Sequence, residues 1–343
     1  MLSALLREWL KLQVKLGLSV YFRRLPVTGA STIPASGPLL FAANHQNSFL
    51  DALMVTITQP RELHYLVRSD VFRKPWADRV LRMLNMLPVF RIRDGWQTLG
   101  NNAPTFARCV EIFRSGGAVL IFPEGNHSTL HRLRPLSRGF TKPIALALEA
   151  DPTLSIHVVP VGLNFSHHTA FRAPAGVHYG KPIAVQDHYH DGLLDANSLR
   201  AALSDALKEL VVHIEDATEA ETLAAQLKSA GADLTDPVAT NELIRKVKQD
   251  GAIIAPAPST ARTTTFSTSL FRLLHFLPLA GWYRLHKTIR DPMFTGSLKS
   301  VYGIFVFPLY YLMAGGLLLV FVGPLAAAVV LIMMVISVQV YRN

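Results

Sequence analysis

The chain of 343 residues is short of cysteine and of acidic residues, and both shortages limit what it does. Cys109 is its one cysteine, so an intrachain disulfide is excluded, which is consistent with a reducing compartment. The 24 Asp and Glu residues are outnumbered by 34 Lys and Arg residues, and the formal net charge is +10. This charge suits an anionic partner: nucleic acid, an acidic membrane surface or a phosphorylated substrate. Because no nucleic-acid-binding motif and no basic run interleaved with aromatic residues is present, nucleic acid is not an expected partner.

The N-terminal segment, residues 1–24, lacks the unbroken apolar run that a cleavable signal peptide requires. Three cations at four-residue spacing, Arg7, Lys11 and Lys15, interrupt it. Trp9 and most of the leucines fall on the other side of a helix. This pattern predicts an amphipathic helix in the membrane interface, and packing on the protein's own core is the alternative.

Residues 25–190 alternate between short apolar runs and helical patterns. The apolar runs predict strands at 38–43, 63–67, 118–122, 156–161 and 176–179. The helical patterns predict helices at 49–59, 70–86, 98–115 and 139–150. Such alternation predicts an α/β domain with a mostly parallel central sheet flanked by helices.

Polar and charged residues dominate the next segment, 191–250, which is predicted to be helical, with helices near 196–216 and 219–230. Residues 251–299 begin with a stretch rich in Pro, Ser and Thr and continue with mixed apolar and basic residues. We therefore expect a linker followed by helices on the membrane surface.

The last segment, 300–343, has no charged residue between Lys299 and Arg342. A membrane span needs about 20 apolar residues, so the segment is long enough for two spans with Gly323-Pro324 as the turn. It is predicted to be a transmembrane helical hairpin, and the cations at both ends place both ends on the cytoplasmic side.

His45 and Asp51 form the first candidate site. His45 directly follows the strand predicted at 38–43, where α/β proteins place their sites, and Asp51 lies in the first turn of the next predicted helix. Asp51 is able to fold back onto one imidazole nitrogen and leave the other as a base, or to serve the helix N-terminus instead. We interpret Ser48, between them, as a helix cap rather than a nucleophile.

Two further clusters follow predicted strands or apolar runs. In the turn Phe122-Pro123-Glu124-Gly125, a carboxylate stands at the mouth of the sheet, either to bind hydroxyl groups or to cap. Arg91 and Arg93 follow the apolar run 86–89, and the planar guanidinium group matches phosphate oxygens. The alternative for either arginine is solvated surface charge.

In this order and at these distances, the clusters resemble the glycerophospholipid acyltransferase superfamily over residues 38–183, with Val159-Pro160-Val161 as a fourth block. Two departures are visible. Five residues rather than the usual four separate His45 from Asp51, and Asn126-His127-Ser128 stands where Thr-Arg-Ser is frequent. Both are similar to the branch that includes the fungal glycerol-3-phosphate/dihydroxyacetone-phosphate acyltransferases, whose first block reads His-x-Asn-x-Phe-x-Asp.

This resemblance implies a membrane-bound O-acyltransferase of phospholipid biosynthesis, expected on the cytoplasmic face of a bacterial inner membrane. It implies that residues 25–190 are the catalytic domain, with His45 as general base and Asp51 as its orienting partner. The implied substrate-binding positions are Asn47, Arg91, Arg93, Glu124, Gly125 and Arg138. The implied partners are acyl-CoA or acyl carrier protein as donor, a glycerol-phosphate lipid acceptor and the phospholipid membrane, and neither a cofactor nor a metal is implied.

Two questions stay open: which acceptor is used, and whether the protein is an enzyme. The acceptor is either glycerol-3-phosphate or 1-acyl-glycerol-3-phosphate, or else another lyso-lipid such as lyso-ornithine or glycine lipid. A non-catalytic lipid-binding module is the rival outside enzymes, but such a module needs no base, and His45 and Asp51 are both present. A metal site at His188 and His190 is not expected, because neither Cys nor a tight acid cluster accompanies them.

Overall fold

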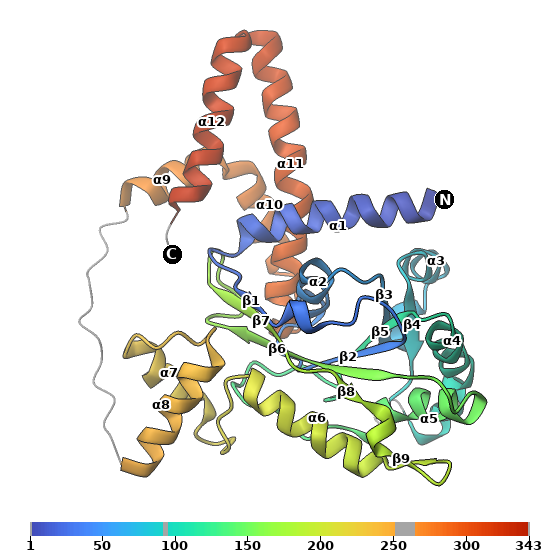
Figure 1. Ribbon diagram of the computed structural model, residues 1–343. Coiled ribbons are helices and arrows are strands. Elements are labelled where there is room, and N and C mark those ends of the chain that lie inside the picture. Colours follow the sequence, from blue (N-terminus) through green and yellow to red (C-terminus); the bar gives the residue numbers. More distant parts are fainter. Residues whose placement is uncertain (1, 92–94, 251–264, 342–343) are drawn as a thin grey trace.

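The computed structural model describes residues 2–91, 95–250 and 265–341. Its centre is an α/β domain built around one large sheet (Figure 1). A helical hairpin projects from this domain. Three helices lie at the base of the hairpin, where it meets the domain: α1 (Leu2–Tyr21), α9 (Thr265–Leu274) and α10 (Phe276–His286).

The sheet has eight strands in the order β1-β7-β6-β2-β5-β3-β4, with β8 paired to β6. Among the described residues, the β6–β7 and β6–β8 pairs are antiparallel and the other neighbours are parallel. The predicted α/β class with a mostly parallel sheet is therefore confirmed, and the sheet is mixed. The strands are β1 (Val27–Thr28), β2 (Leu39–Ala43), β3 (Leu63–Arg68), β4 (Met86–Val89), β5 (Ala118–Ile121), β6 (His157–Phe165), β7 (Ala175–Tyr179) and β8 (Ile183–Ala184).

Helices cover both faces of the sheet, which is why its central strands are apolar on both sides. All five residues of β2 are buried: Leu39, Phe41 and Ala43 belong to one apolar cluster and Leu40 and Ala42 to another. The first cluster packs against α1, α2 (Phe49–Thr58) and α11 (Thr295–Phe321). The second packs against α4 (Ala103–Arg114), α5 (Lys142–Ala150) and α6 (Ala196–Leu210).

Three predicted helices begin later than the sequence pattern indicates, and proline explains the delay. The predicted helix 70–86 is split into η2 (Ser69–Phe72) and α3 (Pro75–Met83). Lys74, which precedes Pro75, is extended, as the residue before a proline usually is, so one continuous helix cannot form. Likewise α4 and α5 carry proline in their first turn and follow the 3-10 helices η4 (Trp96–Asn102) and η5 (Arg138–Thr141).

The helices in the segment after β8 pack against different parts of the protein. The helix α6 packs on the sheet, whereas α7 (Ala220–Ser229) and α8 (Pro237–Asp250) form a small apolar cluster of their own. The sequence pattern did not single out α8. The remaining short elements are η1 (Ala30–Thr32), η6 (Val185–His188), β9 (Tyr189–His190) and β10 (Leu193–Leu194).

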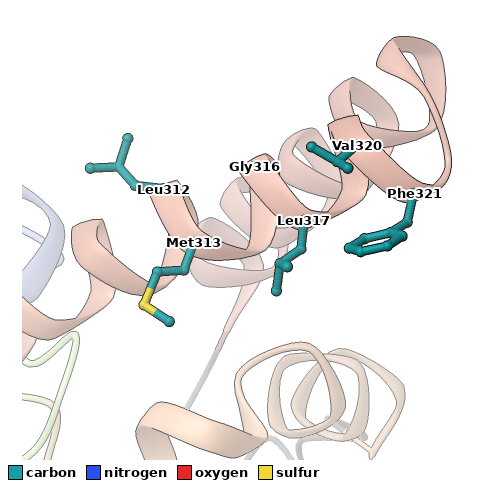
Figure 2. A pocket seen from close by; sticks show the side chains of 6 residues that line it. All are labelled: Leu312, Met313, Gly316, Leu317, Val320 and Phe321. Atoms are coloured by element: carbon teal, nitrogen blue, oxygen red, sulfur yellow. The ribbon is translucent and has the colours of Figure 1, made fainter.

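The C-terminal hairpin consists of α11 and α12 (Pro324–Val340), and Gly323-Pro324 stands at its turn as predicted. Within the described residues, the helix from Pro292 to Phe321 is long and apolar enough to cross a membrane, and α12 is apolar but shorter. Figure 2 shows apolar side chains of α11, among them Leu312, Leu317 and Phe321, that project from the outer face of the hairpin. Most of the predicted linker, 251–264, lies outside the described residues.

Candidate functional site

The sheet topology brings the two main sequence clusters together. The strands β2 and β5 are parallel neighbours in which Ala42 stands opposite Ile121. His45 and Glu124 follow these partners at the same spacing, so both emerge at the carboxyl edge of the sheet. There the His45 amide donates a hydrogen bond of 3.2 Å to Glu124 Oε1.

Asp51 holds the imidazole of His45. Its Oδ2 lies 2.8 Å from His45 Nδ1, and the same oxygen accepts hydrogen bonds from the amides of Gln46, at 2.8 Å, and Asn47, at 2.7 Å. The carboxyl group is fully buried. Asp51 therefore takes the first of the two roles that the sequence left open, since the amides that it receives belong to the loop before α2. Because a carboxylate only accepts, Nδ1 carries a proton, and in the neutral imidazole Nε2 is then the acceptor.

Aromatic rings hold His45 from two sides. Its ring stacks on Phe122 with the centroids 4.1 Å apart and the planes 17° from parallel. His127 meets it edge-on at 5.4 Å, and the side chain of His45 is 16% exposed. A base in such surroundings has a fixed orientation and is still accessible to a substrate.

His127 is a neutral group beside the candidate base. Burial, followed by the nearby charge of His45, lowers the pKa of His127 to about 4. Ser48 Oγ lies 3.4 Å from both ring nitrogens of His127 and 3.5 Å from the carbonyl oxygen of Met293. Ser48 occupies the position before α2, but its side chain makes no capping hydrogen bond, so our interpretation of Ser48 as a cap is wrong. The amide of Leu50, which such a cap would receive, donates instead to Ser297 Oγ at 3.2 Å and to the carbonyl oxygen of Asn47 at 3.1 Å.

Glu124 is buried and engaged through both carboxylate oxygens. Oε1 accepts from the His45 amide, and Oε2 accepts from Arg134 Nε at 2.7 Å. Arg134 also donates to the carbonyl oxygen of Asn126. Burial raises the pKa of Glu124, while the charge of Arg134 acts in the opposite direction. Glu124 thus ties the loop after β5 to the loop that carries His45.

A cleft of about 1280 Å³ opens beside His45 and runs between α1, α2, β3, β4 and α11. Most of its wall is apolar. Its lining also includes seven cationic side chains: Arg7, Lys11, Arg61, Arg68, Arg91, Arg138 and Lys142. The site therefore combines a base with an apolar cavity and positive charge. In the described part of the chain, no group of three His, Cys, Asp or Glu residues is arranged to hold a metal ion.

The structure brings most of the predicted site residues to this cleft. Its lining contains His45, Arg91, Glu124, Gly125 and Arg138, and Asp51 lies behind His45. Arg93 lies outside the described residues.

Asn47 is the exception among the predicted site residues, because it is buried away from the cleft and its side-chain amide donates to the carbonyl oxygen of His168 at 2.7 Å. A role in holding the loop fits Asn47 better than substrate binding.

Sequence reasoning missed three residues at this site. His127 was noted only as a departure from a motif, although its position next to Glu124-Gly125 is a usable signal. Lys142 lines the cleft one turn after Arg138. Ser297 is hydrogen-bonded to Asn47, in the loop that carries His45, although the two residues are 250 positions apart in the sequence. No local sequence pattern predicts this contact.

Comparisons with known proteins place this site in a family. A model of the acyltransferase family matches residues 24–164. Glycerol-3-phosphate O-acyltransferase 2 of Saccharomyces cerevisiae is 34% identical over 119 residues, which is 35% of this chain and 16% of the relative. The chloroplastic 1-acyl-sn-glycerol-3-phosphate acyltransferase BAT2 of Brassica napus is 27% identical over 148 residues, 43% of this chain and 39% of the relative.

A third relative, the lyso-ornithine lipid O-acyltransferase of Rhizobium meliloti, is 28% identical over 148 residues, 43% of this chain and 47% of the relative. The matched regions thus cover less than half the length of each of the three. The family match contains His45, Asp51, Glu124 and Gly125. Residues 24–164 of this chain, which carry the site, are thus similar to the acyltransferase family.

Proposed function

We propose that this protein is a membrane-bound O-acyltransferase that moves a fatty acyl group from a thioester donor to the hydroxyl group of a glycerol-phosphate acceptor. One observation carries the proposal. A histidine oriented by a buried carboxylate, 2.8 Å away, stands at the wall of a cleft that is largely apolar and also lined by cations. A non-catalytic lipid-binding module would have no use for the base.

The reaction needs little more than proton transfer and positioning, because a thioester is already activated. His45 Nε2 takes the proton of the acceptor hydroxyl group. At the same time, the hydroxyl oxygen bonds to the carbonyl carbon of the thioester. When the C–S bond breaks, the thiolate leaves and takes up the proton from the imidazolium group. Asp51 stabilises the imidazolium and keeps the proton of Nδ1 in place. The products are an ester and a free thiol, acyl-CoA or acyl carrier protein being the donor.

We divide the cleft between the two substrates. The apolar side chains of α1, α2 and α11 suit an acyl chain, and Val14, Leu53 and Ile304 are among those that line it. The acceptor phosphate needs a cation. His127 does not supply one, since a pKa of about 4 leaves it neutral at physiological pH. We therefore assign the phosphate to Arg91, Arg138 and Lys142, with Arg93 still a prediction from sequence.

Glycerol-3-phosphate and 1-acyl-glycerol-3-phosphate are the acceptors we favour, and both agree with the names of the yeast and Brassica relatives. The Rhizobium relative supports lyso-ornithine lipid as the second candidate. A zwitterionic head group requires a carboxylate partner as well as a cation. Three carboxylates line the cleft: Glu124 is engaged by Arg134, Glu62 is engaged by Arg7, and Glu8 is exposed on α1. Because the carboxylate beside His45 is already paired, we favour an anionic head group.

We further propose that the protein is held on the membrane by the α11–α12 hairpin and by α1. The outer side chains of the hairpin are apolar and exposed (Figure 2). In α1, Leu5, Trp9, Leu12 and Leu16 are each more than half exposed, whereas Leu18 is buried in the core. The helix α1 therefore packs on the domain along one side, and along the other it presents an apolar surface suited to the membrane interface.

Acyl transfer by the purified full-length protein in detergent tests the proposal. Radiolabelled palmitoyl-CoA and palmitoyl-acyl carrier protein are offered with glycerol-3-phosphate, 1-acyl-glycerol-3-phosphate or lyso-ornithine lipid. We expect product from a phosphorylated acceptor, and His45→Ala should lower kcat by about 10²–10⁴-fold, which is the usual contribution of general-base catalysis.

Asp51→Asn is the matched variant, because it keeps the shape of the side chain and removes its charge. It should also be strongly impaired. Turnover by His45→Ala at the wild-type rate would refute the mechanism. Product from lyso-ornithine lipid alone would mean that this lipid, and not a glycerol-phosphate compound, is the acceptor.

A further inference from the structure

The C-terminal apolar hairpin begins inside the candidate active site. The start of α11 lies against the α/β domain (Figure 1), and Gly296, Ser297 and Ser300 are buried there. Directly before it, the carbonyl oxygen of Met293 lies 3.5 Å from Ser48 Oγ, and the ring of Phe294 meets His127 edge-on at 5.3 Å. The helix with the membrane-anchoring surface thus makes direct contact with the loop between His45 and Asp51.

That loop contains a strained residue. Ser48 has a φ of 49° and a ψ of −133°, a conformation that costs free energy for any residue with a side chain. It lies between Asn47, whose amide donates to Asp51, and the start of α2. A strained residue keeps such a conformation only where its surroundings hold it.

Ser297 holds the backbone on both sides of Ser48. Its hydroxyl donates a hydrogen bond of 2.5 Å to the carbonyl oxygen of Asn47 and accepts one of 3.2 Å from the amide of Leu50. Leu50 also donates to the Asn47 carbonyl at 3.1 Å, so the turn is closed on itself and fixed to α11. Ser297 is fully buried, so these bonds are shielded from bulk solvent.

Gly296 permits this close approach. A Cβ atom at position 296 would stand 2.2 Å from the carbonyl oxygen of His168 and 2.7 Å from Asn47 Oδ1. The side chain of Asn47 in turn donates to the His168 carbonyl at 2.7 Å. The pair Gly296-Ser297 therefore fits against the loop through sterics and hydrogen bonding together.

We propose that Ser297 is a positioning residue of the active site, through which α11 fixes the strained turn at Ser48 and thereby the His45–Asp51 pair. The proposal rests on the proposed function for its kinetic consequence. The hairpin is then a part of the catalytic centre in addition to a membrane anchor. Ser297 does not touch the substrate and acts only through the loop.

Ser297→Ala in the full-length chain, with Ser300→Ala as matched control, tests this role. Both serines are fully buried in α11, but the Ser300 hydroxyl donates within its own helix, to the carbonyl oxygen of Ser297, at 2.8 Å. We expect Ser297→Ala to lower kcat by about 10- to 100-fold, because displacing a catalytic base by about 1 Å lowers the rate by a factor of this size. The KM of both substrates should change little. Ser300→Ala should retain the wild-type kcat.

Hydrogen–deuterium exchange measured by mass spectrometry supplies a readout that needs no activity. The peptide that covers residues 45–51 should exchange faster in Ser297→Ala than in the wild type, and at the wild-type rate in Ser300→Ala. An unchanged kcat with unchanged exchange in Ser297→Ala would overturn the proposal, as would equal losses in the two variants, which would indicate only a weakened helix. If activity survives His45→Ala, the proposed function is refuted instead. The exchange rates of residues 45–51 then still test whether Ser297 fixes the loop.

Discussion

At the scale of single residues, Glu124 illustrates how contacts change an interpretation. The resemblance assigned it to acceptor binding, yet its side chain is 2% exposed and both oxygens are engaged, by the His45 amide and by Arg134. With so little of its side chain exposed, this carboxylate is poorly accessible to a substrate hydroxyl group. The contacts favour a role in which Glu124 sets the position of His45.

Substitution at Glu124 separates these two roles. Glu124→Gln keeps an acceptor for the His45 amide but loses the charge that faces Arg134, and Glu124→Ala loses both. We expect kcat to fall in the order wild type, Gln, Ala, with a loss of about 10²-fold for Ala because the base is misplaced. Initial-rate kinetics with both substrates varied checks this order.

Glu111→Gln is the control, since Glu111 forms an exposed ion pair with Arg108 on α4. It should behave as the wild type does. A Glu124→Ala variant with unchanged kcat and a raised KM for the acceptor alone would return Glu124 to acceptor binding.

At the scale of elements, α1 and α11 cross at a contact that only glycine allows. A Cβ atom at Gly17 would stand 2.3 Å from Cγ1 of Ile304 and 3.1 Å from its Cβ. The same two helices line the cleft beside His45. Their separation would therefore disturb the core and also widen the proposed acyl-chain cavity.

Gly17→Ala should destabilise the protein by about 1–3 kcal/mol, the usual cost of overpacking, and lower its Tm by a few degrees. Gly303→Ala is the matched control, because no atom lies within 4 Å of a Cβ at that position of α11. Combining Gly17→Ala with Ile304→Ala should cost less than the sum of the two single changes. Thermal unfolding of all four variants in one detergent measures this. Equal Tm values for Gly17→Ala and the wild type would mean that Ile304 moves aside freely.

At the scale of the whole molecule, the depth of the hairpin decides how the protein sits in a membrane. The 17 residues of α12 span about 26 Å at 1.5 Å per residue, slightly less than the hydrocarbon core of about 30 Å. The first turn of α11 is buried in the domain and adds nothing to the reach of the hairpin. We therefore expect a hairpin of this length to cross the bilayer with modest local thinning, which costs little per ångström of mismatch.

Cysteine labelling in sealed vesicles of known orientation tests whether the hairpin crosses. The native chain is a suitable background, because burial raises the pKa of the Cys109 thiol to about 12 and keeps it unreactive. We expect a membrane-impermeant maleimide to label Val322→Cys, at the turn, from the face opposite to the one that labels Leu193→Cys in the α/β domain. Both native side chains are largely exposed.

Labelling of both cysteines from one face would contradict a spanning hairpin. Protection of Val322→Cys until detergent is added would do so as well, since it would place the turn within the bilayer.

The amino-acid sequence by itself determined the α/β class, the main strands and the two apolar helices, and it offered the pairing of His45 with Asp51 as one of two roles for that acid. These features depend on neighbours in the chain: alternation of apolar residues, an acid six positions after a histidine, and a long charge-free stretch. The proline-delayed helix starts were also local and could have been read from Pro75, Pro104 and Pro143.

Only the tertiary structure decided what surrounds the base. The partners of Glu124, the neutral state of His127 and the contact of Ser297 with Asn47 depend on strand order and on a helix that returns to the site after 250 residues. Periodicity records which side of an element is apolar, but it does not record which distant element covers that side. Burial at such contacts sets which polar groups must pair, and this pairing turned a recognisable motif into a positioned base.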